Sequence, residues 1–165
     1  MLQTKESMAL QLIKLLSKKK FSIALAESCT AGLTGSLLAR TPGASSVFWG
    51  DFVVYTIDAK QKMLGIDAGL LEKYGTVSRE CACAMAESAR IRANSTFALS
   101  ITGLAGPLGD GSSNPVGLVW IAGAYGGIPT RAQRYRFAGN RNSIRAKAAA
   151  AALRLGLDMV NNIVD

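Results

Sequence analysis

A serine at the end of an apolar segment is the residue of this chain best suited to covalent chemistry. Ser28 follows the run 23–26, which predicts a short strand, and precedes a helical pattern that continues to about Arg40. Such junctions carry reactive groups in α/β proteins, because the N–H groups of the following helix stabilise negative charge. The chain contains no histidine, so a Ser-His-Asp triad is excluded. A nucleophilic Ser28 would need another base, and a lysine made neutral by burial or by a neighbouring positive charge is the leading option.

Three further polar side chains are predicted close to Ser28. Tyr55 closes an aromatic and β-branched segment, and Thr102 closes an apolar one. Lys60 lies in the short helical segment that follows Tyr55. Strand ends meet at one edge of an open sheet, so these side chains could converge on one site. Three of these four residues also have a structural alternative: a helix N-cap for Ser28, an amphipathic sheet-edge residue for Tyr55, and a solvated side chain for Lys60.

A glycine-rich segment and two arginines could hold an anionic ligand. The glycines of 103–117 let the backbone approach a ligand, with N–H groups forming an anion nest. The segment lacks the lysine of a Walker phosphate loop and the glycine pattern of a dinucleotide-binding fingerprint. Arg141 and Arg145 are one helical turn apart, which suits bidentate capture of a phosphate or carboxylate. A long turn and solvated helix arginines are the structural alternatives.

The composition predicts a globular protein with anionic partners. Of its 165 residues, 49% are hydrophobic and 18% charged, which is enough apolar material for a substantial core. The net charge of +8 favours phosphorylated metabolites or nucleic acid as partners, and a generally basic surface is the structural alternative. The only run of three basic residues, 18–20, closes a predicted helix, where lysines complement the helix dipole. We therefore do not expect nucleic acid as a partner.

The three cysteines predict neither a metal site nor disulfides. Cys81 and Cys83 are two residues apart in a helical pattern, so they point to different faces. Cys29 is a rival nucleophile to Ser28, but its usual histidine partner is missing. A sparse, odd cysteine count fits a reducing cytoplasm. The N-terminal stretch is amphipathic and interrupted by charges, so we expect neither a signal peptide nor a membrane span, and a cytoplasmic location.

The order of predicted elements indicates one α/β domain over residues 1–165. A helix is predicted over 5–19 and a strand over 22–26, with Ser28 at the following turn and a helix from there to about Arg40. A strand is predicted over 47–55 and helices over 58–64, 67–74 and 78–93. Strands over 96–102, 116–125 and 130–137 follow, the last two paired as a hairpin, and Asn140 opens a final helix. We expect a three-layer α/β/α sandwich with a mixed central sheet.

Eight blocks of the sequence together resemble the CinA C-terminal domain family in its stand-alone form. They are 26–32 (AESCTAG), 42–48 (PGASSVF), 52–55 (FVVY), 59–65 (AKQKMLG), 75–78 (GTVS), 102–107 (TGLAGP), 115–117 (PVG) and 139–141 (GNR). The blocks run in order through nearly the whole chain. The resemblance implies a nicotinamide-nucleotide amidase, which hydrolyses nicotinamide mononucleotide to nicotinic acid mononucleotide and ammonia in nucleotide salvage. It also implies a homodimer that uses no metal or organic cofactor.

The resemblance assigns roles residue by residue. It implies Ser28 as nucleophile, Lys60 as general base and Tyr55 as a supporting hydroxyl, which agrees with the need for a histidine-free pair. Oxyanion donors are expected beside Cys29 and Thr30 or in the turn 103–106. The predicted substrate-binding residues are Cys29, Thr30, Ala31, Gly32, Thr102, Gly103, Ala105, Gly106, Arg141 and Arg145, of which Thr102 and the two arginines would hold the ribose phosphate.

Several positions depart from the family pattern. Ala31 replaces a glycine, Ile57 an asparagine and Asn140 an acidic residue, and the glycine-rich loop carries Leu108 and Asp110. The Ala31 methyl is expected to narrow the approach to a ligand, and Ile57 removes an amide that could orient Tyr55 or the substrate. The alternative function is therefore a catalytically inactive nucleotide-binding paralogue. A third hypothesis is a nucleic-acid-associated protein, for which steep salt-dependent binding would be required.

Overall fold

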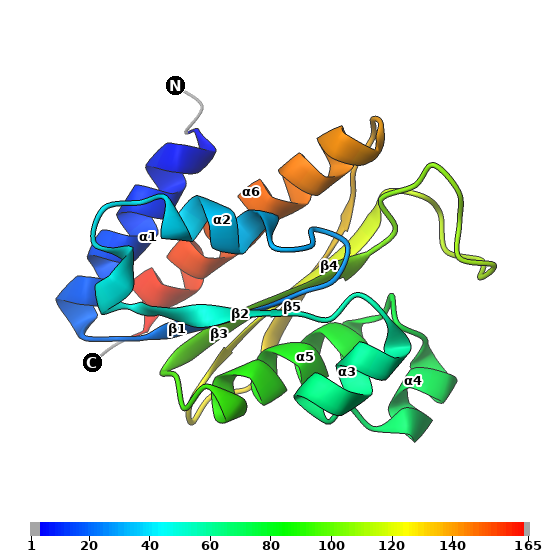
Figure 1. Ribbon diagram of the computed structural model, residues 1–165, viewed down its shortest axis with the longest axis horizontal. Coiled ribbons are helices and arrows are strands. Elements are labelled where there is room, and N and C mark those ends of the chain that lie inside the picture. Colours follow the sequence, from blue (N-terminus) through cyan, green and yellow to red (C-terminus); the bar gives the residue numbers. More distant parts are fainter. Residues whose placement is uncertain (1–3, 164–165) are drawn as a thin grey trace.

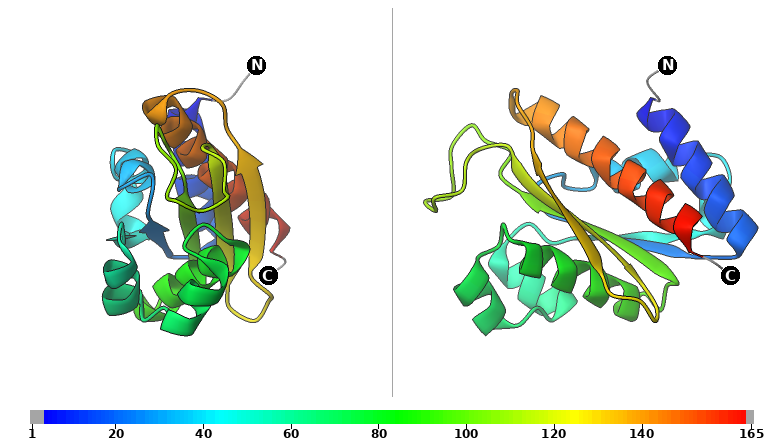
Figure 2. Two further views of the ribbon diagram at one scale, coloured as in Figure 1. Left: turned by 90° about the vertical axis from the view of Figure 1, so that its right-hand side faces the viewer. Right: turned by 180° about the vertical axis from the view of Figure 1, so that it is seen from behind.

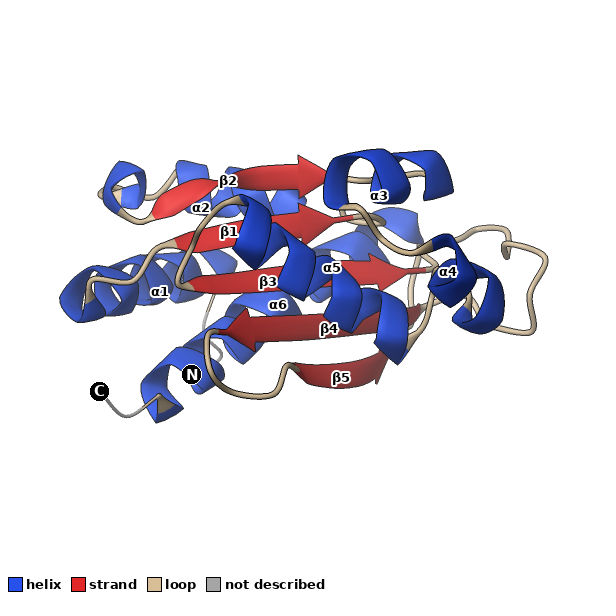
Figure 3. Cartoon of the chain, turned by 90° about the horizontal axis from the view of Figure 1, so that it is seen from below, coloured by secondary structure: helices blue, strands red, loops and turns tan. Residues whose placement is uncertain are grey.

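The central sheet is mixed, as expected. The computed structural model describes residues 4–163 and contains five strands in the order β2-β1-β3-β4-β5 (Figure 3). Strand β1 pairs in parallel with its two neighbours β2 and β3, whereas β3, β4 and β5 pair antiparallel. The strands are β1 (Ile23–Glu27), β2 (Phe48–Val53), β3 (Phe97–Gly103), β4 (Leu118–Tyr125) and β5 (Arg131–Arg136). The predicted β4–β5 hairpin and the mixed sheet are confirmed.

Helices cover both faces of the sheet and complete the expected three-layer α/β/α sandwich (Figures 1 and 2). On one face lie α1 (Lys5–Lys19), α2 (Leu33–Ala39) and α6 (Arg141–Asn162), and on the other α3 (Ile57–Leu64), α4 (Ala68–Tyr74) and α5 (Arg79–Arg92), with a 3-10 turn η1 (Ala44–Ser46) before β2. A large apolar cluster fills the first interface and a smaller one the second. None of the helices in this described part is long and apolar enough to cross a membrane.

Side-chain caps set the starts of most helices. Ser78 accepts a hydrogen bond from the Cys81 N–H, and Asn140 accepts one from the Ser143 N–H at 2.9 Å. An asparagine caps a helix about as well as an aspartate, so the exchange at position 140 keeps the start of α6. Cys81 is buried against α3 and α4, whereas Cys83 faces the side of β4 and β5. The two thiols therefore point to different surroundings, as their spacing predicts.

Two boundaries differ from the prediction in ways that shape the site. Strand β2 ends at Val53, so Tyr55 lies beyond the strand rather than at its end. The reason is that the next carbonyl, that of Val54, accepts a hydrogen bond from the Lys60 Nζ. Helix α2 begins only at Leu33 with Gly32 as its N-cap, so Ser28 does not cap it. A turn of several residues therefore separates Ser28 from the helix.

Candidate active site

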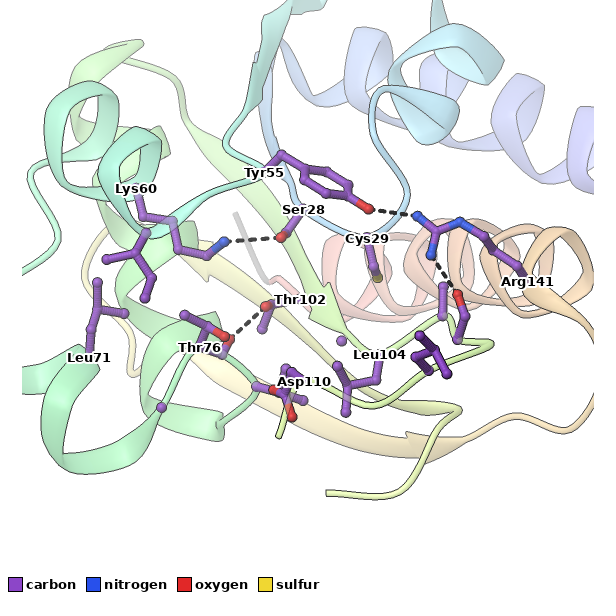
Figure 4. A pocket seen from close by; sticks show the side chains of 17 residues that line it. Ser28, Cys29, Tyr55, Lys60, Leu71, Thr76, Thr102, Leu104, Asp110 and Arg141 are labelled. Atoms are coloured by element: carbon purple, nitrogen blue, oxygen red, sulfur yellow. Dashed lines mark hydrogen bonds between the residues drawn. The ribbon is translucent and has the colours of Figure 1, made fainter. Parts of the chain in front are cut away.

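Ser28 and Lys60 lie beside each other at the carboxyl edge of the parallel strands. Ser28 is the first residue after β1, and its N–H donates to the Ile101 carbonyl at 2.9 Å, which fixes it against β3. Lys60 enters from α3, and its Nζ is 3.0 Å from the Ser28 Oγ (Figure 4). Ser28 is 8% exposed and Lys60 1%. Two side chains 32 residues apart in the sequence thus form one buried hydrogen-bonded pair.

The surroundings of Lys60 favour its neutral form. The helix that carries it is fixed by Thr56, whose Oγ1 accepts from the Ala59 N–H. Burial lowers the pKa of the Lys60 ammonium, because the charged form loses its hydration. The Lys60 Nζ also donates to the Val54 carbonyl at 2.8 Å, which holds its position. A neutral amine in this position has a lone pair that can take the Ser28 proton.

Cys29, the rival nucleophile, is in an unfavourable electrostatic setting. Its side chain also lines the cavity. Burial raises the pKa of the Cys29 thiol to about 11, since the thiolate would be poorly solvated. The reactive form of a cysteine is the thiolate, so Cys29 is a weak nucleophile at neutral pH. The serine is therefore the better candidate of the two.

Tyr55 belongs to the rim of the site. It is 52% exposed, and its hydroxyl accepts a hydrogen bond from the Arg141 Nη2 at 2.6 Å. The other terminal nitrogen of Arg141 donates to the Gly106 carbonyl at 2.6 Å. Arg141 therefore ties together the segment after β2, the loop after β3 and the start of α6 (Figure 4).

Arg145 has a different role from Arg141. Its Nε donates to the Cys29 carbonyl at 3.1 Å, and its Nη2 donates to the Thr30 carbonyl at 2.6 Å. These bonds hold the turn between Ser28 and α2 from behind. Arg141 and Arg145 therefore bind different segments of the chain. In this arrangement they do not form the joint binding site for a phosphate or carboxylate that their spacing suggests.

A cavity of about 480 Å³ opens at the Ser28–Lys60 pair. Of the predicted residues, it is lined by Ser28, Cys29, Tyr55, Lys60, Thr102, Gly103, Ala105, Gly106 and Arg141. Thr30, Ala31, Gly32 and Arg145 lie outside this lining, and the Ala31 methyl is exposed to solvent with φ +49°. The substitution at Ala31 therefore does not narrow the cavity in this structure.

Several cavity residues were not among the residues assigned a catalytic or substrate-binding role from the sequence. They are Ile57, Leu71, Gly75, Thr76, Val77, Leu104, Leu108 and Asp110. The Thr76 carbonyl accepts from the Thr102 Oγ1 at 2.6 Å, so this segment fixes a predicted side chain. The block 75–78 carried part of the family resemblance, and that signal could have placed it at the site.

Some backbone N–H groups of the site already donate hydrogen bonds within the protein. The N–H of Ser28 donates to Ile101, and that of Leu104 donates to the Leu118 carbonyl at 2.8 Å. Neither of these two N–H groups is available to an oxyanion, and each of the two predicted locations therefore loses one donor. Within residues 4–163, no group of three or more His, Cys, Asp or Glu side chains could hold a metal ion.

Fold and site together define a class: a three-layer α/β protein with a buried serine–lysine pair in a cleft at the carboxyl edge of its parallel strands. The CinA C-terminal domain family matches residues 5–160, and the chain belongs to this family.

Similar sequences occur in longer proteins. The chain is 40% identical over 152 residues to a CinA-like protein of Pseudothermotoga lettingae, covering 92% of this chain and 37% of that protein. It is 39% identical over 150 residues to a CinA-like protein of Myxococcus xanthus, covering 91% of this chain and 36% of the relative. The chain thus spans less than two fifths of the length of these relatives.

Solved structures share the whole fold. The competence/damage inducible protein CihA from Agrobacterium tumefaciens superposes with a TM-score of 0.91 at 34% identity, covering 98% of this chain and 99% of that one. The competence damage-inducible protein A (ComA) from Klebsiella pneumoniae gives a TM-score of 0.95 at 25% identity, covering 98% and 100%. The α/β fold predicted from the sequence is therefore confirmed.

Proposed function

We propose that this protein is a nicotinamide-nucleotide amidase in which Ser28 is the nucleophile and Lys60 the general base. The observation that supports this proposal most directly is the 3.0 Å separation of Lys60 Nζ and Ser28 Oγ. The burial that lowers the Lys60 pKa supports it as well, because a base must be neutral to accept a proton.

In the proposed reaction, the neutral Lys60 amine takes the Ser28 proton while Ser28 Oγ attacks the carboxamide carbon. The tetrahedral intermediate collapses as the Lys60 ammonium returns that proton to the departing nitrogen, which leaves as ammonia. The resulting ester on Ser28 is cleaved by water. Lys60 takes a proton from the water and then returns it to Ser28, which releases the carboxylate product. Backbone N–H groups beside Cys29 and Thr30, or in the turn 103–106, would stabilise the oxyanion.

The cavity is also suited to an anionic nucleotide. A nucleotide-sized ligand fits a volume of this order. Arg141 is in the lining and Arg145 is not, so we assign the contact with the phosphate to Arg141 and a supporting role to Arg145. Thr102, at the end of β3, would contact the sugar or phosphate.

The decisive experiment measures release of ammonia and nicotinic acid mononucleotide from nicotinamide mononucleotide. We expect the intact protein to be active and Ser28→Ala to be inactive with an unchanged melting temperature. Ser36→Ala, an exposed serine of α2, is the matched control and should retain full activity. Activity that persists in Ser28→Ala would contradict the proposed nucleophile.

The alternative proposal is a nucleotide-binding paralogue without turnover. Its support is that Ile57 and Asp110 both line the cavity, one as an exposed apolar side chain and the other as a carboxylate. This alternative predicts that nicotinamide mononucleotide raises the melting temperature while no ammonia appears.

We further propose that the chain acts as a cytoplasmic homodimer on a small-molecule nucleotide, with no nucleic-acid partner. Sedimentation velocity of the purified protein tests the dimer. A salt-dependent DNA-binding assay tests the nucleic-acid hypothesis, and steep loss of binding with added salt would support that hypothesis instead.

A further inference from the structure

Two carboxyl groups are buried behind the turn that carries Ser28. Glu27, the last residue of β1, is 0% exposed, and both carboxyl oxygens of Asp51 in β2 are buried. In the parallel pairing of these strands, Leu25 lies opposite Asp51 and Glu27 opposite Val53. Because side chains alternate along a strand, Glu27 and Asp51 lie on the same face of the sheet, toward α2.

Gly35 of α2 is in contact with both carboxyl groups. Its N–H donates to the Glu27 Oε1 at 2.7 Å. A Cβ on Gly35 would lie 2.7 Å from the Asp51 Oδ2, so the missing side chain provides the space that Asp51 occupies. The helix thus packs directly onto the acid pair.

The pair needs one proton to be compatible with this burial. Within residues 4–163, Glu27 Oε2 and both Asp51 oxygens have no hydrogen-bond donor, and two bare carboxylates would repel each other. If one group is protonated, its O–H can donate to the other. Burial, and then the neighbouring Glu27, raise the Asp51 pKa to about 8.

In the part of the chain that the structure describes, no cation offsets the charge of this carboxyl pair. Asp51 and Glu27 are the only ionisable residues of β1 and β2, and neither α2 nor η1 contains one. From α6, the Arg145 guanidinium faces the same turn but is held by the Cys29 and Thr30 carbonyls. The adjacent Cys29 thiol is neutral at these pH values, since burial raises its pKa to about 11.

We propose that Glu27 and Asp51 share one proton and that this protonated pair positions Ser28 for attack. Glu27 directly precedes Ser28, and its bond to the Gly35 N–H closes a ring around the turn from Ser28 to α2. Loss of the proton sets two negative charges against each other, which weakens this bond and displaces Ser28 from Lys60. The proposal rests on the proposed function only in taking Ser28 as the nucleophile.

The test uses Asp51→Asn, whose amide donates a hydrogen bond to Glu27 at every pH. A fluorophosphonate reports the reactivity of Ser28 without a carboxamide substrate, because Ser28 Oγ bonds to phosphorus, fluoride leaves and Lys60 accepts the serine proton. We expect equal labelling rates for Asp51→Asn and the wild type at about pH 6. At about pH 9 the variant should be labelled about tenfold faster, because most of the wild-type pair has lost its proton.

The ratio of the two rates cancels the titration of Lys60, which both proteins share. Asp158→Asn, at an exposed acid of α6, is the matched control and should follow the wild type throughout. Parallel pH profiles for Asp51→Asn and the wild type would overturn the proposal.

Carbon-13 NMR of the labelled carboxyl groups in the unsubstituted protein gives a second readout that needs neither a variant nor catalysis. We expect one carboxyl group to titrate near pH 8. If every Asp and Glu titrates below about pH 6, the shared proton is refuted. If the pair titrates as expected but Ser28 is never labelled, the assignment of the nucleophile in the proposed function is wrong, and with it the positioning role.

Discussion

The Arg141 Nη2 donates to the Tyr55 hydroxyl at 2.6 Å, joining the first turn of α6 to the segment after β2. The same guanidinium donates to the Gly106 carbonyl. A lysine at this position keeps the charge but cannot span both partners, because it lacks the planar fork of arginine.

Arg141→Lys is therefore expected to lower kcat/KM for nicotinamide mononucleotide by about tenfold or more, because the hydrogen bonds that hold Tyr55 and Gly106 at the edge of the cavity are not both kept. Arg134→Lys, on the exposed edge of β5, should have no effect. In a double-mutant cycle, Tyr55→Phe and Arg141→Lys should be non-additive by about 1 kcal/mol, since they break the same bond. Additive losses would mean that the contact between Tyr55 and Arg141 does not matter for turnover.

Lys60→Met separates the catalytic from the structural role of the buried lysine. Turnover should fall by about 10³-fold or more, because the proposed base is lost. The free energy of unfolding should fall by about 1–3 kcal/mol, since methionine leaves the buried Val54 carbonyl without the donor that Lys60 provides. Steady-state kinetics and urea unfolding measure the two effects. The matched control is Lys62→Met, which removes an exposed lysine paired with Asp58 on the same helix and should leave turnover unchanged. Near-normal turnover of Lys60→Met would refute Lys60 as the proposed base.

The dependence of stability on pH should contain two opposing contributions. Asp51 holds its proton in the folded state up to about pH 8 but loses it near pH 4 when unfolded, so its contribution falls as the pH rises through this window. Lys60 has a lowered pKa in the folded state, so its contribution rises with pH toward the pKa of the unfolded chain. Urea unfolding across this range should show the fall, which Asp51→Asn should remove and Lys60→Met should not. If the free energy of unfolding of Asp51→Asn falls with pH as steeply as that of the wild type, groups other than Asp51 cause the fall.

Ala31 should be replaceable by glycine with a gain in stability. Its φ of +49° lies in the left-handed region, which costs an alanine about 1–2 kcal/mol, whereas glycine adopts it freely at an entropic cost of about 0.5–1 kcal/mol. We expect Ala31→Gly to raise the free energy of unfolding by up to about 1 kcal/mol in urea titrations. Ala150→Gly, in the regular part of α6, should lower it by about 1 kcal/mol and serves as the control. A loss at position 31 would show that the methyl has a stabilising contact.

The sequence predicts the elements well because their signals are local. Ser78 and Asn140 are cap residues, and both begin helices at the expected positions. The boundary after β2 could not be predicted in the same way. It depends on the Val54 carbonyl, which bonds to a lysine side chain from the next helix.

The candidate site likewise contains residues that could be predicted from the sequence and residues that could not. The pairing of Ser28 with Lys60 was predicted from the family resemblance and from the absence of histidine, and the two atoms lie 3.0 Å apart. The acid pair behind them was not predicted. Asp51 alone suggests a polar position in a strand, and its burial depends on the space left by Gly35, which is distant in the sequence. Contacts of this kind arise only from tertiary packing.

The contact between Gly35 and Asp51 constrains how this part of the sequence can diverge. Any side chain at position 35 would occupy the space of the Asp51 carboxyl. A relative with alanine at position 35 therefore needs a residue smaller than aspartate, such as glycine, at position 51. We expect these two positions to covary among homologues, so that the buried acid is gained or lost together with the glycine and marks a distinct lineage within the family.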